Sequence, residues 1–203
     1  MSISIIDYKA GNITSVLRAV RNLGHEDAAI SADPAVIAAA DRVIFPGVGA
    51  AGSCMANLRE RGMDAALRDA VAAGTPVLGI CIGMQLILDV SDEDGGVDCL
   101  GLVPGRVELI EPPDASYKVP HMGWNPVAFA ADEPLAEGVP EGSCFYFVHS
   151  FRCVPAPGVQ VIATTDHGVE ICAGVRRDNL VAVQFHPEKS GEVGLRVLKN
   201  FLG

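Results

Sequence analysis

The chain has 203 residues, of which 49% are hydrophobic and 20% are charged, and its 25 acidic and 15 basic residues give a formal net charge of −10. This length fits one domain, and the apolar content is high enough to bury a core, which excludes wholesale disorder. The acidic balance argues against a nucleic-acid partner, because contact with phosphates needs clustered Lys and Arg. We therefore expect one folded domain that does not bind nucleic acid.

Neither a targeting segment nor a membrane span is predicted. Asp7 ends the first apolar run after a few residues, no basic segment precedes that run, and no other run approaches the roughly 20 apolar residues that cross a bilayer. We therefore expect a soluble, cytoplasmic protein with no membrane partner.

Six cysteines are spread along the chain without metal-binding spacing. The sequence has no C-x-x-C pair and no H-x-x-x-H pair, so we expect no metal site. In a reducing compartment a cysteine is by default a small buried hydrophobic residue, and we expect this for all but one of the six. They are Cys54, Cys81, Cys99, Cys144, Cys153 and Cys172.

The first 80 residues alternate short apolar runs with amphipathic helical patterns. The apolar runs predict strands buried on both faces over residues 3–6, 42–45 and 76–80. The helical patterns cover residues 13–23, with Asn12 as N-cap and Gly24 as stop, and residues 63–71, which Gly74 and Pro76 end. This alternation favours an α/β fold, an open and mostly parallel sheet with helices on both faces.

Prolines interrupt the chain after residue 100, and the segments between them are short. Apolar stretches over residues 145–148, 159–163 and 180–185 predict strands, and the turn dipeptide Asp178-Asn179 precedes the last of them. We expect these strands to form a mixed or antiparallel extension of the sheet, followed by a final helix over residues 192–201.

Residues 89–98 form an acidic tract. It carries five carboxylates and no basic residue, and because like charges repel and resist packing we expect a solvated loop. The carboxylates are Asp89, Asp92, Glu93, Asp94 and Asp98.

A glycine-rich segment, Gly47-Val-Gly-Ala-Ala-Gly52, matches the G-x-G-x-x-G dinucleotide-binding pattern after a predicted strand. The context does not fit that pattern, because Asp64 and Asp69 lie in a predicted helix and not at the end of a second strand. We therefore expect no dinucleotide cofactor. The glycines instead mark backbone that can adopt a positive φ or approach a ligand closely.

Cys81 is the exception among the cysteines. It lies between Gly79 and Gly83, at the point where the strand over residues 76–80 meets an apolar helical segment over residues 84–88. A sharp strand-to-helix turn with small flanking residues is typical of a nucleophile elbow, here with Cys in place of Ser. The start of the following helix favours the thiolate, and the Ile82 amide can serve as an oxyanion donor.

His186 is the candidate base among the five histidines. It ends a predicted strand and is followed by Pro187 and Glu188. In extended backbone, residues i and i+2 face the same way, so Glu188 can accept a hydrogen bond from one imidazole nitrogen while the other faces Cys81. A surface histidine and glutamate at a strand end remain the alternative.

These two segments resemble the motifs of the triad-type, or class I, glutamine amidotransferases. Gly79-Ile-Cys81-Ile-Gly-Met-Gln85 and His186-Pro-Glu188 carry the Cys, His and Glu of that family in its order. The resemblance covers the whole chain and implies a single amidotransferase domain over residues 1–203. It further implies hydrolysis of L-glutamine through a γ-glutamyl thioester on Cys81, with release of ammonia and glutamate and with no cofactor.

Further segments are similar to one subfamily, the glutaminase subunits of imidazole glycerol phosphate synthase. The matching strings are Pro46-Gly-Val-Gly49, Asp7-Tyr8 with Gly11-Asn12-Ile13, His121-Met-Gly-Trp-Asn125 and Tyr146-Phe-Val-His-Ser150. The resemblance implies a heterodimer in which ammonia passes to a cyclase subunit with a (β/α)8 barrel, which forms imidazole glycerol phosphate and AICAR in histidine biosynthesis. Lys9 departs from the subfamily, where glycine is common, which puts details of the partner-facing loop in doubt.

The resemblance also implies a role for each matching residue. In the family, the oxyanion peptide turns inward only in the active assembly, and the glycines on both sides of Val48 make such a change sterically easy. Trp124 could instead be a buried core residue, since large aromatic residues serve both purposes. The implied catalytic residues are Cys81, His186 and Glu188; the oxyanion residues are Ile82, Gly47, Val48 and Gly49; the glutamine-binding residues are Gln85, Glu93, His149, Ser150 and Phe151; the partner-facing residues are Asn12, His121, Trp124, Asn125 and Lys189.

Three other functions remain open at this point. The first is a glutaminase that serves another synthase, for example in anthranilate, aminodeoxychorismate or pyridoxal phosphate synthesis, against which the Pro46–Gly49 and His121–Asn125 strings argue. The second is a regulatory module without catalysis, which the complete Cys81, His186 and Glu188 set opposes. The third is a cysteine peptidase or acyl hydrolase, which would turn over peptides or esters.

Overall fold

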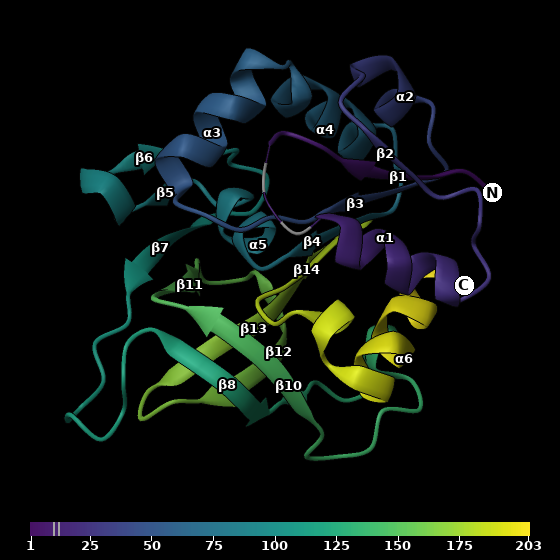
Figure 1. Ribbon diagram of the computed structural model, residues 1–203. Helices are drawn as coiled ribbons and strands as arrows, with labels where there is room; N and C mark the ends of the chain where they lie inside the picture. The colour runs from purple at the N-terminus through teal and green to yellow at the C-terminus, as the bar shows by residue number, and fades with distance from the viewer. Residues whose placement is uncertain (10, 12) are drawn as a thin grey trace.

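Parallel strands form the centre of the molecule in the computed structural model, which describes residues 1–9, 11 and 13–203 (Figure 1). Each strand is a short apolar run, and β1, β4 and β14 are buried along their whole length, as predicted for a sheet covered on both faces. The strands, in spatial order, are β2 (Ala29–Ser31), β1 (Ile3–Ile6), β3 (Arg42–Phe45), β4 (Val77–Ile80) and β14 (Leu180–Val183).

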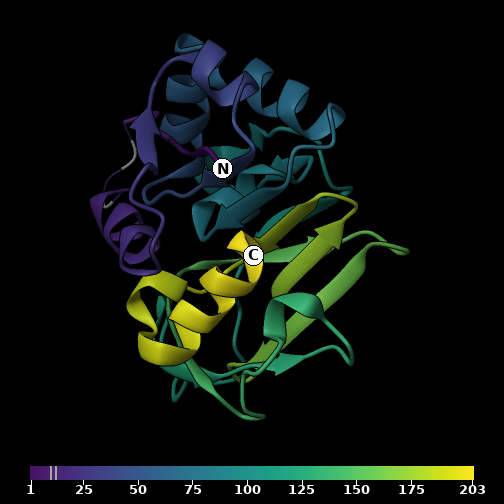
Figure 2. The same ribbon diagram turned by 90° about the vertical axis from the view of Figure 1, so that its right-hand side faces the viewer.

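Helices cover both faces of this parallel sheet, which confirms the predicted α/β fold (Figures 1 and 2). One face carries α2 (Pro34–Ala38), α3 (Ala51–Glu60) and α4 (Met63–Ala72), and the other carries α1 (Ile13–Asn22) and α6 (Gly191–Leu202). The predicted cap of α1, Asn12, lies outside the described residues. Within the described part of the chain, no helix combines the length and the hydropathy that crossing a membrane requires.

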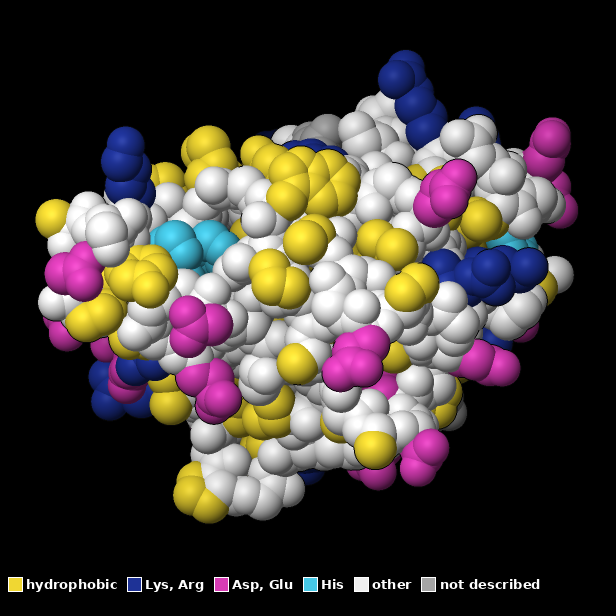
Figure 3. Space-filling model, turned by 90° about the horizontal axis from the view of Figure 1, so that it is seen from below, with side chains coloured by type: hydrophobic (Ala, Val, Ile, Leu, Met, Phe, Trp, Pro, Cys, Tyr) yellow, Lys and Arg dark blue, Asp and Glu magenta, His cyan; other side chains and the backbone are white. Residues whose placement is uncertain are grey.

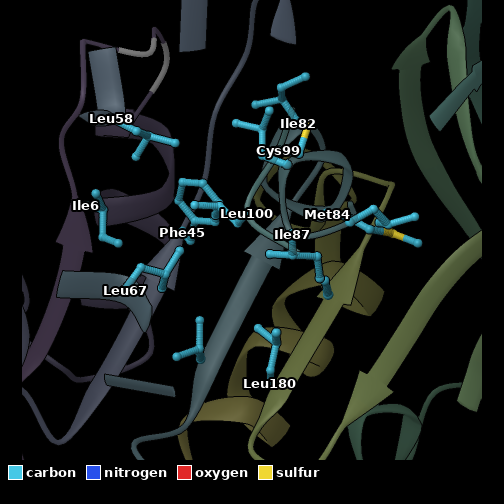
Figure 4. Close-up of a cluster of buried hydrophobic side chains, with 14 of the residues drawn as sticks. Ile6, Phe45, Leu58, Leu67, Ile82, Met84, Ile87, Cys99, Leu100 and Leu180 are labelled. Atoms are coloured by element: carbon cyan, nitrogen blue, oxygen red, sulfur yellow. The ribbon is translucent and has the colours of Figure 1, made fainter. Parts of the chain in front are cut away.

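Two apolar clusters lie on the two sides of the sheet, because successive strand residues point to opposite faces. Ile6 and Phe45 pack with Leu58 and Leu67 of α3 and α4 in the first cluster (Figure 4). Their strand neighbours, such as Ile5 and Ile44, pack in the second cluster with residues of α1 and α6. The rigid sheet between the clusters carries the strand ends that we describe below.

Mostly antiparallel strands extend the sheet beyond β14, as predicted, with one parallel pair between β5 and β7. Asp178 begins the turn before β14 with a φ of 53°, the left-handed geometry that tight turns use. The extension passes from β14 to β13 (Glu170–Arg177), β11 (Phe151–Pro155), β7 (Gly105–Leu109), β5 (Val90–Ser91) and β6 (Val97–Asp98), while β12 (Gln160–Asp166) joins β13 to β9 (Ala128–Phe129). A separate antiparallel ribbon consists of β8 (His121–Pro126) and β10 (Cys144–His149).

The acidic tract is not the plain solvated loop that the sequence predicted. It forms β5, the short 3₁₀ helix η1 (Glu93–Gly95) and β6, because Val90 pairs with Asp98, and Ser91 with Val97, through the backbone. Asp92 and Asp94 remain exposed, but Glu93 is partly buried. Other elements were not predicted either, namely β2, α2, α3, β7, β8, β9, β11 and the 3₁₀ helix η2 (Pro134–Ala136).

Candidate active site

Cys81 lies in a strained turn between β4 and the five-residue helix α5 (Ile82–Leu86). Its φ of 56° and ψ of −112° are rare for a residue with a side chain, and its amide donates to the Val183 carbonyl at 2.8 Å. Gly83 makes the turn possible, because a Cβ at this position would lie 2.1 Å from the Phe45 carbonyl oxygen. The predicted elbow geometry is therefore present, with a helix that begins directly after the cysteine.

His186 and Glu188 form a buried pair behind the elbow. Nδ1 of His186 lies 2.9 Å from Oε1 of Glu188, and both side chains are 2% exposed. The predicted contact is present, but the predicted extended backbone is wrong, because residues Pro187–Lys189 form the 3₁₀ helix η3. This tight turn curls the chain back and brings the Glu188 carboxylate to the ring. Strand β14 also ends at Val183, earlier than predicted.

The charge state of His186 depends on its two neighbours. Burial lowers the pKa of His186, but hydrogen bonding and charge attraction from Cys81 and Glu188 outweigh it and raise this pKa to about 9. The carboxylate can only accept, so Nδ1 donates to Glu188. Among the described residues, Nε2 has no hydrogen-bond partner of standard geometry, which leaves it available for proton transfer.

A cavity of about 360 Å³ opens in front of Cys81. It brings together three of the four predicted oxyanion residues and all five predicted glutamine-binding residues, along with Pro120 and Val148, which were not predicted. Val148 lies inside the Tyr146–Ser150 string, so that string was a signal for it, whereas nothing in the sequence indicated Pro120. The predicted residues in the lining are Val48, Gly49, Cys81, Ile82, Gln85, Glu93, His149, Ser150 and Phe151.

Gly47 does not line this cavity. It borders a much smaller space on the other side of Val48, together with His186 and Glu188. A Cβ on Gly47 would lie 1.8 Å from the Tyr8 hydroxyl oxygen, so glycine is needed here for close packing. Gly49 has a φ of 120°, and the Cys54 thiol lies 3.8 Å from the Val48 carbonyl oxygen.

The two predicted side-chain ligands of glutamine, Gln85 and Glu93, are each held in the cavity wall by hydrogen bonds. Gln85 is buried, and its Nε2 donates to the Phe151 carbonyl at 3.2 Å and to Oε1 of Gln184 at 3.0 Å. Glu93 accepts from the Ala51 amide at 2.7 Å, at the start of α3. Burial raises the pKa of the Glu93 carboxyl, although the Ala51 amide opposes that shift. A carboxylate and amide groups in the lining of one cavity suit an amino-acid ligand.

Three comparisons with known proteins give the family and the fold of the chain. The profile of the family "glutamine amidotransferase class-I" matches residues 4–203. The chain is 48% identical to imidazole glycerol phosphate synthase subunit HisH of Moorella thermoacetica, over 98% of this chain and 93% of the relative. It is 49% identical to subunit HisH of Methanothermobacter thermautotrophicus, over 98% and 97%.

The chain belongs to the class I glutamine amidotransferases, within the family of the HisH subunits. Solved structures share the amidotransferase fold at low identity. One titled "glutamine amidotransferase" has a TM-score of 0.76 and 20% identity over 98% of this chain and 96% of that one. The structure of PurLQS from Thermotoga maritima has a TM-score of 0.75 and 20% identity over 99% and 97%.

The predicted partner-facing residues of this amidotransferase differ in their exposure. Trp124 is 57% exposed on β8, so the buried-core alternative for it is wrong, and Met122 beside it is 62% exposed. Lys189 is partly exposed, with Nζ 5.5 Å from the centre of the Tyr146 ring. The face seen from below in Figure 3 carries many exposed hydrophobic side chains, with histidine side chains beside them. His121, by contrast, is 3% exposed and offers almost no surface to a partner.

The other cysteines of the amidotransferase divide into four buried residues and one exposed residue. Cys144 is exposed at the start of β10, against the expectation that it would be buried. Burial raises the pKa of Cys99 to about 11 and that of Cys172 to about 12, so both stay thiols at neutral pH. The described His, Cys, Asp and Glu residues include no group of three that could hold a metal ion.

Proposed function

We propose that Cys81, His186 and Glu188 of this chain hydrolyse L-glutamine for imidazole glycerol phosphate synthesis. The observation that carries the proposal is the 360 Å³ cavity, in which Cys81 faces the predicted oxyanion and glutamine-binding residues. The 2.9 Å contact between His186 and Glu188 behind it supports the same assignment. We also propose that residues 1–203 form one amidotransferase domain, and that it acts in the cytoplasm as biosynthetic relatives would.

In the first half of the reaction, the Cys81 sulfur attacks the side-chain carboxamide carbon of glutamine. His186, with its pKa near 9, carries the proton of the former thiol and gives it to the leaving nitrogen, so that ammonia departs and a γ-glutamyl thioester remains. Water then attacks the thioester while His186 accepts its proton, and glutamate leaves as the cysteine is restored. The net change is glutamine plus water to glutamate plus ammonia.

The oxyanion of each tetrahedral intermediate needs hydrogen-bond donors placed where the charge develops. The Ile82 amide at the start of α5 is one donor in this proposal, and an amide of the Gly47–Gly49 segment is the second. Glu93 would hold the α-ammonium group of glutamine, and Gln85 with residues 149–151 would hold the other end. Their positions around one cavity support these roles.

The relatives are named as subunits of a synthase, which supports a partner for this chain. We propose that the partner is a (β/α)8-barrel cyclase subunit that receives the ammonia and forms imidazole glycerol phosphate and AICAR in histidine biosynthesis. The exposed Trp124 and Lys189 would contact it, as would the half-buried Asn125, while Asn12 lies outside the described residues.

The test mixes the purified chain with its cyclase subunit, the phosphorylated ribulosyl substrate and glutamine. We expect glutamate release to be stimulated and an imidazole product to carry the glutamine amide nitrogen, followed with ¹⁵N-labelled glutamine. Glutamate release without any imidazole product would indicate a different synthase. Turnover of peptides or esters in preference to glutamine would indicate a peptidase or acyl hydrolase, and no turnover would indicate a regulatory module.

A further inference from the structure

A row of hydrogen bonds runs through the interior from β8 to the sulfur of Cys81. Nδ2 of Asn125 lies 3.3 Å from Nε2 of His121, and Nδ1 of His121 lies 3.0 Å from Nε2 of His149. Nδ1 of His149 lies 2.7 Å from the Phe151 carbonyl oxygen. Apart from the half-buried Asn125, these side chains are more than nine-tenths buried.

The second half of the row starts at the same carbonyl. Gln85 donates to the Phe151 oxygen through Nε2, at 3.2 Å, and to Oε1 of Gln184, at 3.0 Å. Gln184 is fully buried, and its own Nε2 lies 3.8 Å from the Cys81 sulfur. Gln184 was not singled out in the sequence, although it lies two residues before His186.

The chemistry of the acceptors fixes the direction of every bond in the row. A carbonyl oxygen only accepts, so Nδ1 of His149 must carry a hydrogen. Burial lowers the pKa of His149 to about 4 and that of His121 to about 3, so both rings are neutral at pH 7. The free Nε2 of His149 then accepts from His121, and Nε2 of His121 accepts from the Asn125 amide. The second Asn125 hydrogen is directed to the Asp166 carbonyl at 2.6 Å.

The hydrogen-bond partners of Gln85 also determine the orientation of the Gln184 amide. Gln85 uses Nε2 as a donor to both acceptors, so Gln184 must present its oxygen to Gln85 and its NH₂ group to Cys81. An N–H group directed at a sulfur stabilises a thiolate more than a thiol, because the bond is stronger to an ionised acceptor. If the Phe151 carbonyl moved, Gln85 would lose one of the two bonds that hold its amide in this orientation.

We propose that Gln184 is a further catalytic residue, whose amide stabilises the Cys81 thiolate, and that His121 and His149 are positioning residues that hold Gln184 in this orientation through Phe151 and Gln85. The proposal rests on the proposed role of Cys81 as nucleophile and assigns His121 an internal role. The near-complete burial of His121 and its stacking on Phe147, with ring centres 4.8 Å apart, fit that assignment.

The first test measures the sulfur directly, without glutamine or partner. In a Cys144→Ala background, which removes the exposed thiol, Cys81 is alkylated with iodoacetamide at pH 7 and the rate is followed by mass spectrometry. We expect Gln184→Met, of similar shape without N–H groups, to slow alkylation about threefold to tenfold, the value of one hydrogen bond. Gln160→Met on the exposed part of β12 is the matched control and should leave the rate unchanged.

The second test separates a positioning role of His121 from a merely structural one. His121→Asn places an amide N–H near the position of Nδ1 and should retain most of the alkylation rate. His121→Phe keeps the ring that stacks on Phe147 but has no donor, and it should slow alkylation nearly as much as Gln184→Met. His25→Asn, in the turn after α1, is the control for loss of a histidine.

The same variants are assayed as glutaminases with the cyclase subunit. We expect Gln184→Met to lower kcat by a larger factor than it raises the KM for glutamine, because the bond to the nucleophile is lost outright, whereas Gln85 loses one acceptor and keeps the Phe151 carbonyl as the other. In ¹⁵N spectra of the histidine-labelled protein, His121 and His149 should both carry their hydrogen on Nδ1.

The outcomes distinguish this proposal from the proposed function. Unchanged alkylation in folded Gln184→Met, equal rates for His121→Asn and His121→Phe, or an Nε2–H form of His149 would each overturn the hydrogen-bonded row. Slower alkylation in a protein that releases no glutamate with any partner would leave the row standing and remove the glutaminase assignment.

Discussion

The parallel and antiparallel halves of this amidotransferase hold the site by different means. In the parallel half, the position of Cys81 depends on backbone contacts, such as the approach of Gly83 to the Phe45 carbonyl, where a Cβ would lie 2.1 Å away. In the antiparallel half, the cavity wall depends on side-chain hydrogen bonds through His149 and His121. A close backbone contact does not allow a larger residue at its position. A side-chain hydrogen bond allows any residue that supplies the same donor.

Removal of the nucleophile should have the largest effect. Cys81→Ala is expected to lower glutamine-dependent synthesis by about 10⁴-fold or more, because no other described thiol lines the cavity. Partner binding and folding should be unchanged, which a thermal unfolding curve and titration with the cyclase subunit would show. Cys144→Ala, which removes the exposed thiol of the antiparallel half, is the control and should retain full activity. Activity that survives Cys81→Ala would mean that another residue is the nucleophile.

An added methyl group at the elbow should destabilise the parallel half. Gly83→Ala is expected to lower the free energy of unfolding by about 3 kcal/mol, because the new Cβ would overlap the Phe45 carbonyl oxygen. Urea unfolding followed by circular dichroism measures this difference. Gly24→Ala is the matched control, since its Cβ would meet no heavy atom within 4 Å and only the φ of +96° opposes it, at about 1 kcal/mol. Equal losses for the two variants would contradict the role given to close packing.

Removal of the Glu188 charge should change the pKa of His186 and the pH dependence of kcat/KM. Glu188 helps to raise the pKa of His186 to about 9, so Glu188→Gln should lower that pKa and move the alkaline limb of kcat/KM to lower pH. We also expect kcat/KM at pH 7 to fall about 10²-fold, since the ring loses its orienting acceptor. Glutamate release across pH 6 to 10 measures both, with Glu192→Gln on the exposed start of α6 as the control. An unmoved alkaline limb would show that it reports another group.

The exposed face of the antiparallel half should matter for association and not for folding. Trp124→Ala is expected to weaken binding of the cyclase subunit by about 2 kcal/mol, because aromatic residues dominate many interfaces. The free energy of unfolding should change by less than about 0.5 kcal/mol, since the side chain is 57% exposed. Calorimetric titration measures the affinity, and Val161→Ala on β12 serves as the exposed control. Unchanged affinity would place the interface elsewhere.

Most of the fold and the turn that holds the candidate nucleophile followed from local patterns. Short apolar runs predicted β1, β3 and β4, and the glycines around Cys81 predicted the elbow, because strand burial and tight turns each require particular residue types. Helix α3 escaped prediction because Ala51–Glu60 mixes small and polar residues, and only packing of Leu58 and Met55 against the sheet makes it helical. The acidic tract was assigned from charge alone, and the backbone pairing of Val90 with Asp98 overrode that assignment.

The sequence by itself determined the class of fold, and it singled out Cys81 as the candidate nucleophile and His186 as the candidate base, because each depends on residue type at short range. Only the tertiary structure decided that Glu188 reaches His186 through a 3₁₀ turn, that His121 lies inside the protein, and that Gln184 directs its amide at Cys81. The last of these facts depends on a contact between residues as far apart in the sequence as 81 and 184. The packing of distant segments determines such contacts, and local sequence patterns do not predict them.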